Sequence, residues 1–240
     1  MKDATNSPFD PQPLVKRGLL AGYVTSHMFS KLTDSQIEYW EKHKTELGKK
    51  LSEVFEIIDV HIDARRRWEQ FYKSEFGWTV NFGSVVVPIR PSIGQWRLIF
   101  IAKGMTLGKV FKAWKFEKFE YSIDLDKELI NKRTAAEHYA VWILAGDEPD
   151  EKYLNMPVEK ADPIMEIGMT LLERMILESY HFAITGKHLD MKGATICSGS
   201  RHADGRVPFV APYSDGAVRV NWLNLDAIHD GYGIREAIRC

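Results

Sequence analysis

The residues best suited to metal chemistry are Glu178 and His181, three positions apart, and the closely spaced pair His61 and Asp63. A di-iron site in a helical bundle needs Glu-x-x-His on two separate helices, together with two further carboxylates. No such full ligand set is present, and Gly186 predicts that the helix carrying Glu178 ends soon after His181. The pattern therefore favours a solvated helix face or a hydrogen-bonded histidine over a metal site.

A second group of possible ligands is the acidic cluster Asp147, Glu148, Asp150 and Glu151. A calcium-binding loop alternates its oxygen ligands and turns tightly at a glycine, and this cluster lacks that arrangement. A metal-dependent hydrolase that uses this cluster or the pair His61 and Asp63 remains an open alternative. Bound metal in the purified protein would be its signature.

Motifs for nucleotide binding and serine hydrolysis are absent from the sequence. It contains no GxGxxG, no GxxxxGK[ST] and no GxSxG. The 240 residues include 32 basic and 33 acidic side chains, so overall charge gives no argument for binding nucleic acid or a membrane. The two cysteines lie far apart in the sequence. The N-terminus has no apolar leader, and no apolar run is long enough to span a membrane. We therefore expect a cytoplasmic protein.

One local segment favours nucleic acid nevertheless. Arg65, Arg66 and Arg67 precede Trp68 and Phe71, a mixture of basic and aromatic residues seen in proteins that bind single strands. A nucleic-acid-associated protein that binds through these N-terminal helices is therefore our alternative function.

The order of expected elements indicates an α+β fold. Capping boxes at Thr33/Gln36 and Thr170/Glu173 predict two helix starts, and Gly186 predicts the end of the second helix. Apolar runs predict strands over residues 96–102 and 139–145, with a short helix over 106–114 between them. From Gly186 to Cys240 the pattern predicts mostly β-hairpins.

The C-terminal part of the chain resembles the variable proteins of diversity-generating retroelements, which end in a C-type-lectin-like domain. The resemblance covers about 70 residues. It rests on Thr170-Leu-Leu-Glu-Arg, Thr185-Gly-Lys-His-Leu-Asp190, Ser198-Gly-Ser-Arg201, Asp204-Gly205, Val207-Pro208, Val220-x-Trp222 and Gly233-Ile-Arg235. It implies that residues 133–240 form a C-type-lectin-like domain whose opening strand, over 139–145, pairs with its last strand. Residues 1–132 would be a separate helical and α+β region of unknown role.

In that family a reverse transcriptase copies a template with errors at adenines, so that exposed positions vary while the core stays fixed. The resemblance thus implies a ligand-binding protein that is not an enzyme, needs no cofactor and binds a macromolecule, most simply a protein. The implied variable positions are His202, Ala203, Arg206, Phe209, Ala211, Tyr213, Arg219, Asn221, Leu223, Ala227, His229, Gly231 and Ile234. The implied framework positions are Gly199, Arg201, Asp204, Gly205, Val207, Pro208, Val220, Trp222 and Arg235.

The alternation of residue types agrees with this implication. Arg219, Asn221 and Leu223 alternate with Val218, Val220 and Trp222, which predicts one apolar and one mixed strand face. Mixed faces of aromatic, small and polar residues suit adaptable binding surfaces. Because interface hot spots favour aromatics and arginine, we expect Tyr213, Phe209 and Arg206 to be the anchors.

The chain also departs from two other groups of proteins with this fold. Sugar-binding C-type lectins have a Trp-Asn-Asp calcium motif and paired disulfides, whereas this chain has Trp222-Leu-Asn-Leu-Asp226 and no disulfide pattern. Formylglycine-generating enzymes need two neighbouring active-site cysteines. Cys197 and Cys240 are far apart, and Cys197 occupies what reads as an inward strand position.

Overall fold

The computed structural model describes residues 31–114, 116–118 and 124–239. The chain divides into two compact units, Met1–Asp59 and Val60–Cys240. Both helices and strands are present, as expected for an α+β fold. None of the helices within the described residues is long and apolar enough to cross a membrane.

The first described helix begins where the sequence predicts. Helix α2 covers Asp34–Lys42 after the Thr33 cap, and the Gln36 side chain accepts a hydrogen bond from the Thr33 N–H at 2.9 Å. Helix α3 covers Lys44–Phe76 without interruption. The sequence predicts one helix from the Thr33 cap through Ile58 and a second around Trp68, whereas the structure ends α2 at Lys42 and continues α3 through both regions.

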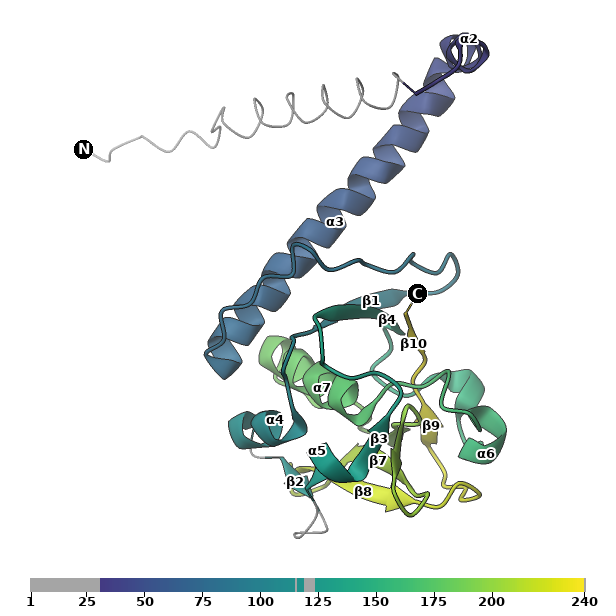
Figure 1. The fold of residues 1–240 in the computed structure, drawn as a ribbon. Coiled ribbons are helices and arrows are strands. Elements are labelled where there is room, and N and C mark those ends of the chain that lie inside the picture. The colour runs from purple at the N-terminus through teal and green to yellow at the C-terminus, as the bar shows by residue number, and fades with distance from the viewer. Residues whose placement is uncertain (1–30, 115, 119–123, 240) are drawn as a thin grey trace, which may run out of the picture. The chain divides into compact units, whose positions relative to one another are not determined.

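The unit Val60–Cys240 contains three sheets (Figure 1). The three-stranded sheet has the order β1-β4-β10, the five-stranded sheet has the order β2-β8-β7-β5-β9, and β3 pairs with β6. The strands are β1 Trp96–Ile101, β2 Glu117–Lys118, β3 Leu129–Asn131, β4 Tyr139–Leu144, β5 Ala194–Ile196, β6 Ser200–His202, β7 Val207–Pro212, β8 Val218–Leu223, β9 Tyr232–Ile234 and β10 Ala237–Ile238. The remaining helices are α4 Leu107–Trp114, α5 Leu125–Glu128, η1 Glu151–Tyr153, α6 Val158–Ala161 and α7 Leu171–Thr185.

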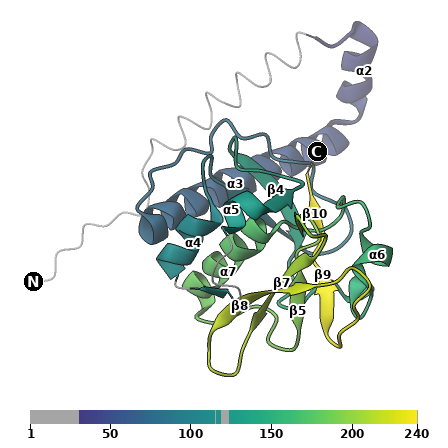
Figure 2. The ribbon, with the colours of Figure 1, turned by 60° about the horizontal axis from the view of Figure 1, so that its bottom comes forward.

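Helix α7 is the centre of this unit and lies between the three-stranded and five-stranded sheets (Figure 2). Its first turn has the predicted capping box, since Thr170 N–H donates to Glu173 at 2.7 Å and Glu173 N–H donates to the Thr170 hydroxyl at 3.2 Å. It ends at Gly186, whose φ of 67° is the left-handed conformation that glycine adopts readily. Met175 and Ile176 are fully buried in the main hydrophobic core.

Strand β1 is an edge strand whose outward carbonyls are bound by α3. β1 pairs with all six residues of β4, from Trp96 opposite Leu144 to Ile101 opposite Tyr139. On its other side, Trp68 Nε1 donates to Leu98 O at 3.1 Å and the Tyr72 hydroxyl donates to Phe100 O at 3.0 Å. Side chains of α3 thus satisfy the edge that a neighbouring strand would otherwise pair with.

The predicted domain boundary at residue 132 is therefore wrong for this chain. Residues 60–132 supply β1 and the core side chains Trp68, Phe71 and Tyr72, and the compact unit begins at Val60. The sequence misleads here because the residues that carry the resemblance to a known family do not include β1. The hydrophobic core, in contrast, includes β1 through its pairing with β4.

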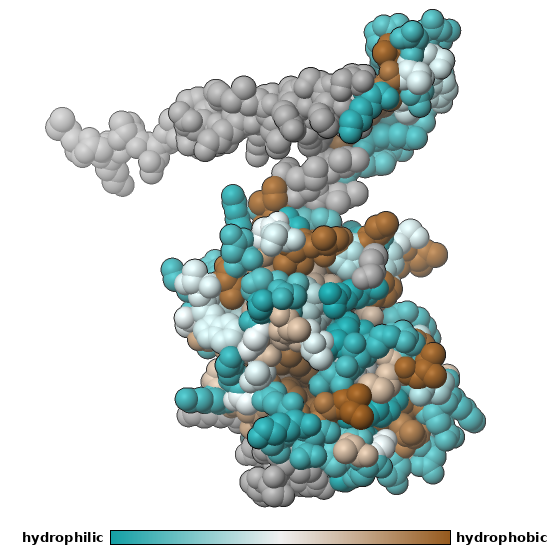
Figure 3. Space-filling model, viewed as in Figure 1, coloured by the Kyte–Doolittle hydropathy of each residue, from teal (hydrophilic) through white to brown (hydrophobic). Residues whose placement is uncertain are grey.

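The connection from Gly77 to Gln95 carries the most exposed large apolar side chains among the described residues of this unit. Val86, Ile89 and Ile93 are each 85 % exposed. Figure 3 shows hydrophobic residues on this face in scattered groups between hydrophilic ones. Isolated apolar residues of this kind are common on soluble surfaces.

Candidate ligand-binding face

The hairpin of β7 and β8 brings expected variable positions from two strands onto one face. Phe209 pairs with Asn221, and Ala211 pairs with Arg219. Val207 lies opposite Leu223 on the same face, two residues further along each strand. Because side chains alternate between the two faces of a sheet, these residues share one side, as the alternation predicts.

Most of that face is covered by the chain rather than open to solvent. It packs in a second hydrophobic cluster beneath the segment of η1 and α6, which contributes Val158 and Ala161. Backbone hydrogen bonds hold this segment in place, with Asp150 N–H donating to Ile234 O at 3.0 Å and Asn155 N–H donating to Tyr232 O at 2.8 Å. The abundance of Asp, Glu and Pro from Gly146 to Pro163 predicts a surface connection, but the structure buries Val158 and Ala161 of this segment in the core.

Four expected variable positions are consequently buried: Phe209, Ala211, Leu223 and Ile234 are 5 %, 6 %, 6 % and 0 % exposed. The expectation that they lie on an exposed face, and that Phe209 anchors a partner, is wrong. Alternation in a sequence shows that a strand has two different faces. It does not show whether another segment covers the second one.

Gly231 is also unsuited to vary. Its φ is +74°, and a Cβ there would lie 2.7 Å from the Lys192 carbonyl oxygen. Its N–H donates to Asn155 Oδ1 at 2.8 Å. Both the backbone conformation and the close approach require glycine.

The remaining open part of this face is what we call the exposed rim: Tyr213, Arg219, Asn221, Ala227, His229 and Tyr232. Arg219 lies over the Tyr213 ring, with 4.6 Å from its guanidinium carbon to the ring centroid, and forms an ion pair with Asp215. The Tyr232 ring lies 5.0 Å from the His229 ring and 5.0 Å from that of Phe209. Burial, together with Tyr213, raises the pKa of Tyr232.

Tyr232 is a residue of this rim that the sequence did not single out. The resemblance assigns variable positions at Gly231 and Ile234, on either side of it. The sequence could have indicated Tyr232 by its position two residues before Ile234, which places both side chains on the same face of β9.

His202, Ala203 and Arg206 lie elsewhere, in the β6–β7 turn. The His202 ring lies 5.0 Å from that of Trp222, and the Arg206 guanidinium lies 5.6 Å from the Trp222 centroid. Asp204 binds both His202 Nδ1 and Arg206 Nε at 2.8 Å. Hydrogen bonds, first from the Arg206 N–H and then from the His202 and Arg206 side chains, lower the pKa of Asp204 to about 2.

Trp222 and Asn221 are consecutive in β8 and therefore point to opposite faces of the sheet. The turn group and the exposed rim are thus separate. The expected variable positions do not form one continuous surface.

The expected framework residues include the most tightly held side chains of the unit. Arg235 is fully buried; its Nη2 donates to Asp190 at 2.6 Å and its Nε donates to the Thr195 hydroxyl at 3.0 Å. Arg201 donates to the Ser198 and Ser200 carbonyls at 2.6 and 3.0 Å. Val207, Pro208 and Val220 are buried, whereas Asp204 and Gly205 are exposed in the turn.

Arg235 belongs to a buried ion-pair network beneath the face. Arg174 binds Glu178 and Asp190, both at 2.7 Å, and His188 lies 2.8 Å from Glu178. Burial raises the pKa of Asp190, but Arg174 and Arg235 outweigh this effect, so the pKa is lowered overall. The two arginines of the network balance the charges of its two carboxylates. Because no charge is left over to bind a ligand, we assign the network a structural role.

The candidate metal ligands point apart. Glu178 binds Arg174 and His188, while His181 Nδ1 lies 3.4 Å from Arg97 Nη1. His61 and Asp63 lie on α3, and within the described residues no three potential metal-ligating side chains come together. Asp150 of the acidic cluster is buried and accepts the Glu236 N–H at 2.7 Å.

The aromatic residues behind the nucleic-acid alternative belong to the core. Trp68 is 1 % exposed and Phe71 is 5 % exposed, so neither can stack on a base. Arg66 and Arg67 are exposed, while Arg65 donates to Val85 O at 2.8 Å. Only the basic part of that pattern is available at the surface.

Cys197 is fully buried at the end of β5, in agreement with its expected inward position. Burial raises the pKa of its thiol well above the usual range. Because the thiolate is the reactive form, this cysteine is a packing residue and a poor nucleophile.

No protein-family model, no curated protein and no solved structure matches this chain.

Proposed function

We propose that the chain is a ligand-binding protein, without catalytic activity, whose C-terminal part is a C-type-lectin-like domain of the kind found in variable proteins of diversity-generating retroelements. The observation that carries this proposal is the antiparallel pairing of β4 with β10. Ala237 lies opposite Ile143 and Ile238 lies opposite Trp142. The fold named by the resemblance closes in this way, with its opening strand beside its last strand.

The buried framework supports the same proposal. A binding surface that changes from copy to copy requires a scaffold whose stability does not depend on the surface residues. Here Arg174, Asp190 and Arg235 are all 0–1 % exposed and pair with one another below the sheet. Replacement of exposed-rim residues would leave these contacts intact.

The exposed rim has the chemistry of an adaptable protein-binding surface. Tyr213 and Tyr232 supply aromatic area, and Arg219 and Asn221 supply polar contacts. Tyrosine and arginine are enriched among residues that dominate binding energy at interfaces. A folded protein that buries about 800 Å² on each side would cover this rim and its surroundings.

Sequencing the DNA that flanks the gene tests this proposal. We expect a near-copy of the segment encoding residues 196–238, beside a reverse-transcriptase gene and differing from it mainly at adenines. The structure sharpens the expected pattern. Differences should fall at codons of the exposed rim, such as those for Tyr213, Arg219 and His229, and should avoid Gly231 and Arg235.

The segment encoding α7 is the internal control, because it lies outside the expected repeat and should have no near-copy. If no repeat flanks the gene, the proposal of a diversified surface is wrong. The same conclusion follows if the differences concentrate at buried framework codons.

A further inference from the structure

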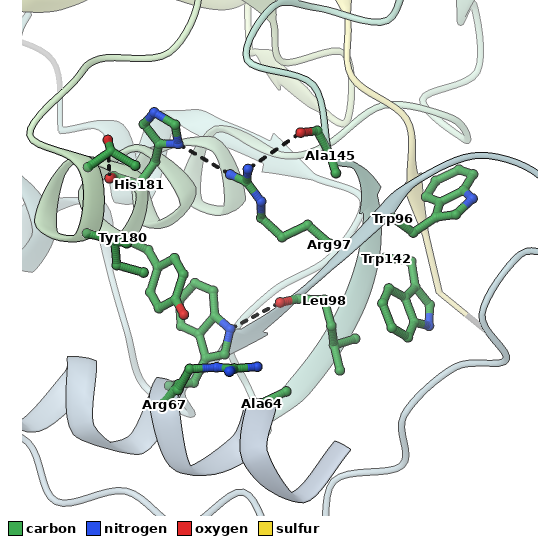
Figure 4. Close-up of a pocket in the computed structure, with 12 residues that line it drawn as sticks. Ala64, Arg67, Trp96, Arg97, Leu98, Trp142, Ala145, Tyr180 and His181 are labelled. Atoms are coloured by element: carbon green, nitrogen blue, oxygen red, sulfur yellow. Dashed lines mark hydrogen bonds between the residues drawn. The ribbon is translucent and has the colours of Figure 1, made fainter. Parts of the chain in front are cut away.

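A pocket of about 520 Å³ lies within the unit Val60–Cys240, on the side of the three-stranded sheet. Side chains from α3, β1, β4 and α7 line it, among them Arg67, Trp96, Arg97, Trp142 and Tyr180 (Figure 4). Its volume is in the range of small-molecule sites. None of the exposed-rim residues lines it, so the pocket is independent of the proposed protein-binding surface.

Arg97 is a half-buried cation in this pocket, and none of the carboxylates that the structure describes forms an ion pair with it. Its Nη1 lies 3.4 Å from His181 Nδ1 and its Nη2 lies 3.5 Å from the Ala145 carbonyl, both at the outer limit of hydrogen bonding. The buried arginines Arg133, Arg174 and Arg235 each bind a carboxylate at 2.6–2.7 Å, and buried Arg201 instead donates to carbonyls, the shortest contact being 2.6 Å to Ser198 O. Because buried charges are normally paired, the open position beside Arg97 suits an anion.

The neighbouring histidine does not neutralise the Arg97 charge. Burial and the Arg97 charge both lower the pKa of His181, which keeps its ring neutral near pH 7. Burial lowers the pKa of Arg97 and Asp147 acts in the opposite direction, from beyond ion-pair distance. Within the described part of the pocket the charge is therefore positive.

Aromatic rings form the walls of the pocket. Trp68 and Tyr180 stack with 4.0 Å between their centroids and 14° between their planes. The indole N–H groups are already bound, to Leu98 O from Trp68, to Ile93 O from Trp96 and to Pro88 O from Trp142. Trp96 and Trp142 point to the opposite face of the three-stranded sheet from Arg97, because Trp96 precedes Arg97 in β1 and Trp142 pairs with Leu98. Trp68 is only 1 % exposed, so the ring that is open to a ligand on the Arg97 side is the half-buried Tyr180.

We propose that this pocket binds a small organic anion, whose oxyanion group contacts Arg97 and whose flat apolar body packs against Tyr180. A planar guanidinium matches the geometry of a carboxylate, sulfonate or phosphate group. The Tyr180 ring beside it favours an aromatic body over a flexible aliphatic one. Arg67, exposed at the mouth of the pocket, adds a second positive charge on the approach.

The test uses the full chain and 1-anilinonaphthalene-8-sulfonate, an aromatic sulfonate that fluoresces when it binds. We expect saturable binding to one site. Arg97→Gln should weaken it by about 10-fold or more, the loss of a charge-assisted hydrogen bond. Arg66→Gln, an exposed arginine of α3 outside the pocket, is the matched control and should leave the affinity unchanged.

Two further comparisons separate charge recognition from general apolar binding. The neutral analogue N-phenyl-1-naphthylamine should bind wild type and Arg97→Gln equally. Ile184 lines the pocket and is 63 % exposed, so its substitution leaves the core intact. Ile184→Glu should weaken sulfonate binding through repulsion, and Ile184→Gln should not.

Thermal unfolding followed by circular dichroism checks that each variant is folded. Absence of saturable sulfonate binding to wild type would overturn the proposal. Equal affinity of wild type and both charge variants, Arg97→Gln and Ile184→Glu, would do the same, because the probe would then recognise apolar surface alone.

Discussion

At the scale of single residues, the most consequential side chains are the charged ones below the five-stranded sheet. Glu178 and Asp190 are both fully or almost fully buried, and each has a lowered pKa. In both cases burial raises the pKa, and the partners together lower it by more: Arg174 and His188 at Glu178, and Arg174, Arg235 and Thr195 at Asp190. Removal of one partner leaves an uncompensated buried charge, which is costly even where the intact pair contributes little net stability.

We therefore expect Asp190→Asn to lower the free energy of unfolding by about 3–5 kcal/mol, because Arg235 then lacks its carboxylate. A lowered pKa in the folded state means that the unfolded state binds more protons near pH 4. Stability is then complete above the unfolded pKa values of about 4, and it is lost as the pH falls through the folded ones.

Urea unfolding between about pH 3 and pH 7 measures both effects. Wild type should lose stability below about pH 4, and Asp190→Asn should show a smaller acid-dependent loss. Asp63→Asn, which changes an exposed carboxylate on α3, should behave as wild type does. An unaltered acid profile in Asp190→Asn would contradict the assigned role of the network.

At the scale of elements, a glycine can be required for two different reasons. Another backbone segment can approach too closely for a side chain, or a helix can end in a left-handed conformation. Gly199 N–H donates to Met169 O at 3.1 Å, just before α7 begins. A Cβ at Gly199 would lie 2.6 Å from the Gly168 carbonyl oxygen. At Gly186, which ends α7, a Cβ would meet nothing within 4 Å, and only the positive φ opposes a side chain.

These two glycines should therefore respond differently to the same substitution. Gly186→Ala should cost about 1 kcal/mol, the penalty for a left-handed alanine. Gly199→Ala should cost about 3 kcal/mol, because backbone atoms of two segments must separate. Chemical unfolding of both variants measures the difference, and equal costs would mean that the segments before α7 and after β5 can move apart freely.

At the scale of the whole molecule, the core of the unit Val60–Cys240 is continuous from α3 to the C-terminal strands. Phe71 and Tyr72 share the main cluster with Met175 of α7 and Val210 of β7. The six-residue ladder between β1 and β4 crosses the boundary that sequence resemblance suggests. A lectin-like domain that starts at residue 133 would leave one edge of β4 unpaired.

Two fragments test this continuity. Residues 60–240 should unfold in a single cooperative transition, because they keep the whole core. Residues 133–240 should fail to fold or should aggregate, because β4 would expose an apolar edge that β1 normally covers. Circular dichroism and thermal unfolding distinguish these outcomes, and a stable cooperative 133–240 fragment would restore the sequence-based boundary.

The sequence alone determined the features that depend on neighbours along the chain. Thr170, Glu173 and Gly186 mark the ends of α7 because caps act over three or four residues. The apolar runs over β1 and β4 predict strands for the same reason. The resemblance adds one long-range feature, the pairing of the opening and closing strands, which β4 and β10 display.

Only the tertiary structure decided which surfaces are open. Phe209 and Tyr213 look equivalent in the sequence, yet η1 and α6 cover the first and leave the second partly exposed. Arg97 reads as an ordinary strand residue until α7 places Tyr180 and His181 beside it, and no carboxylate of the described residues pairs with it. Exposure and charge pairing depend on segments far apart in the chain, and no local pattern of residue types records them.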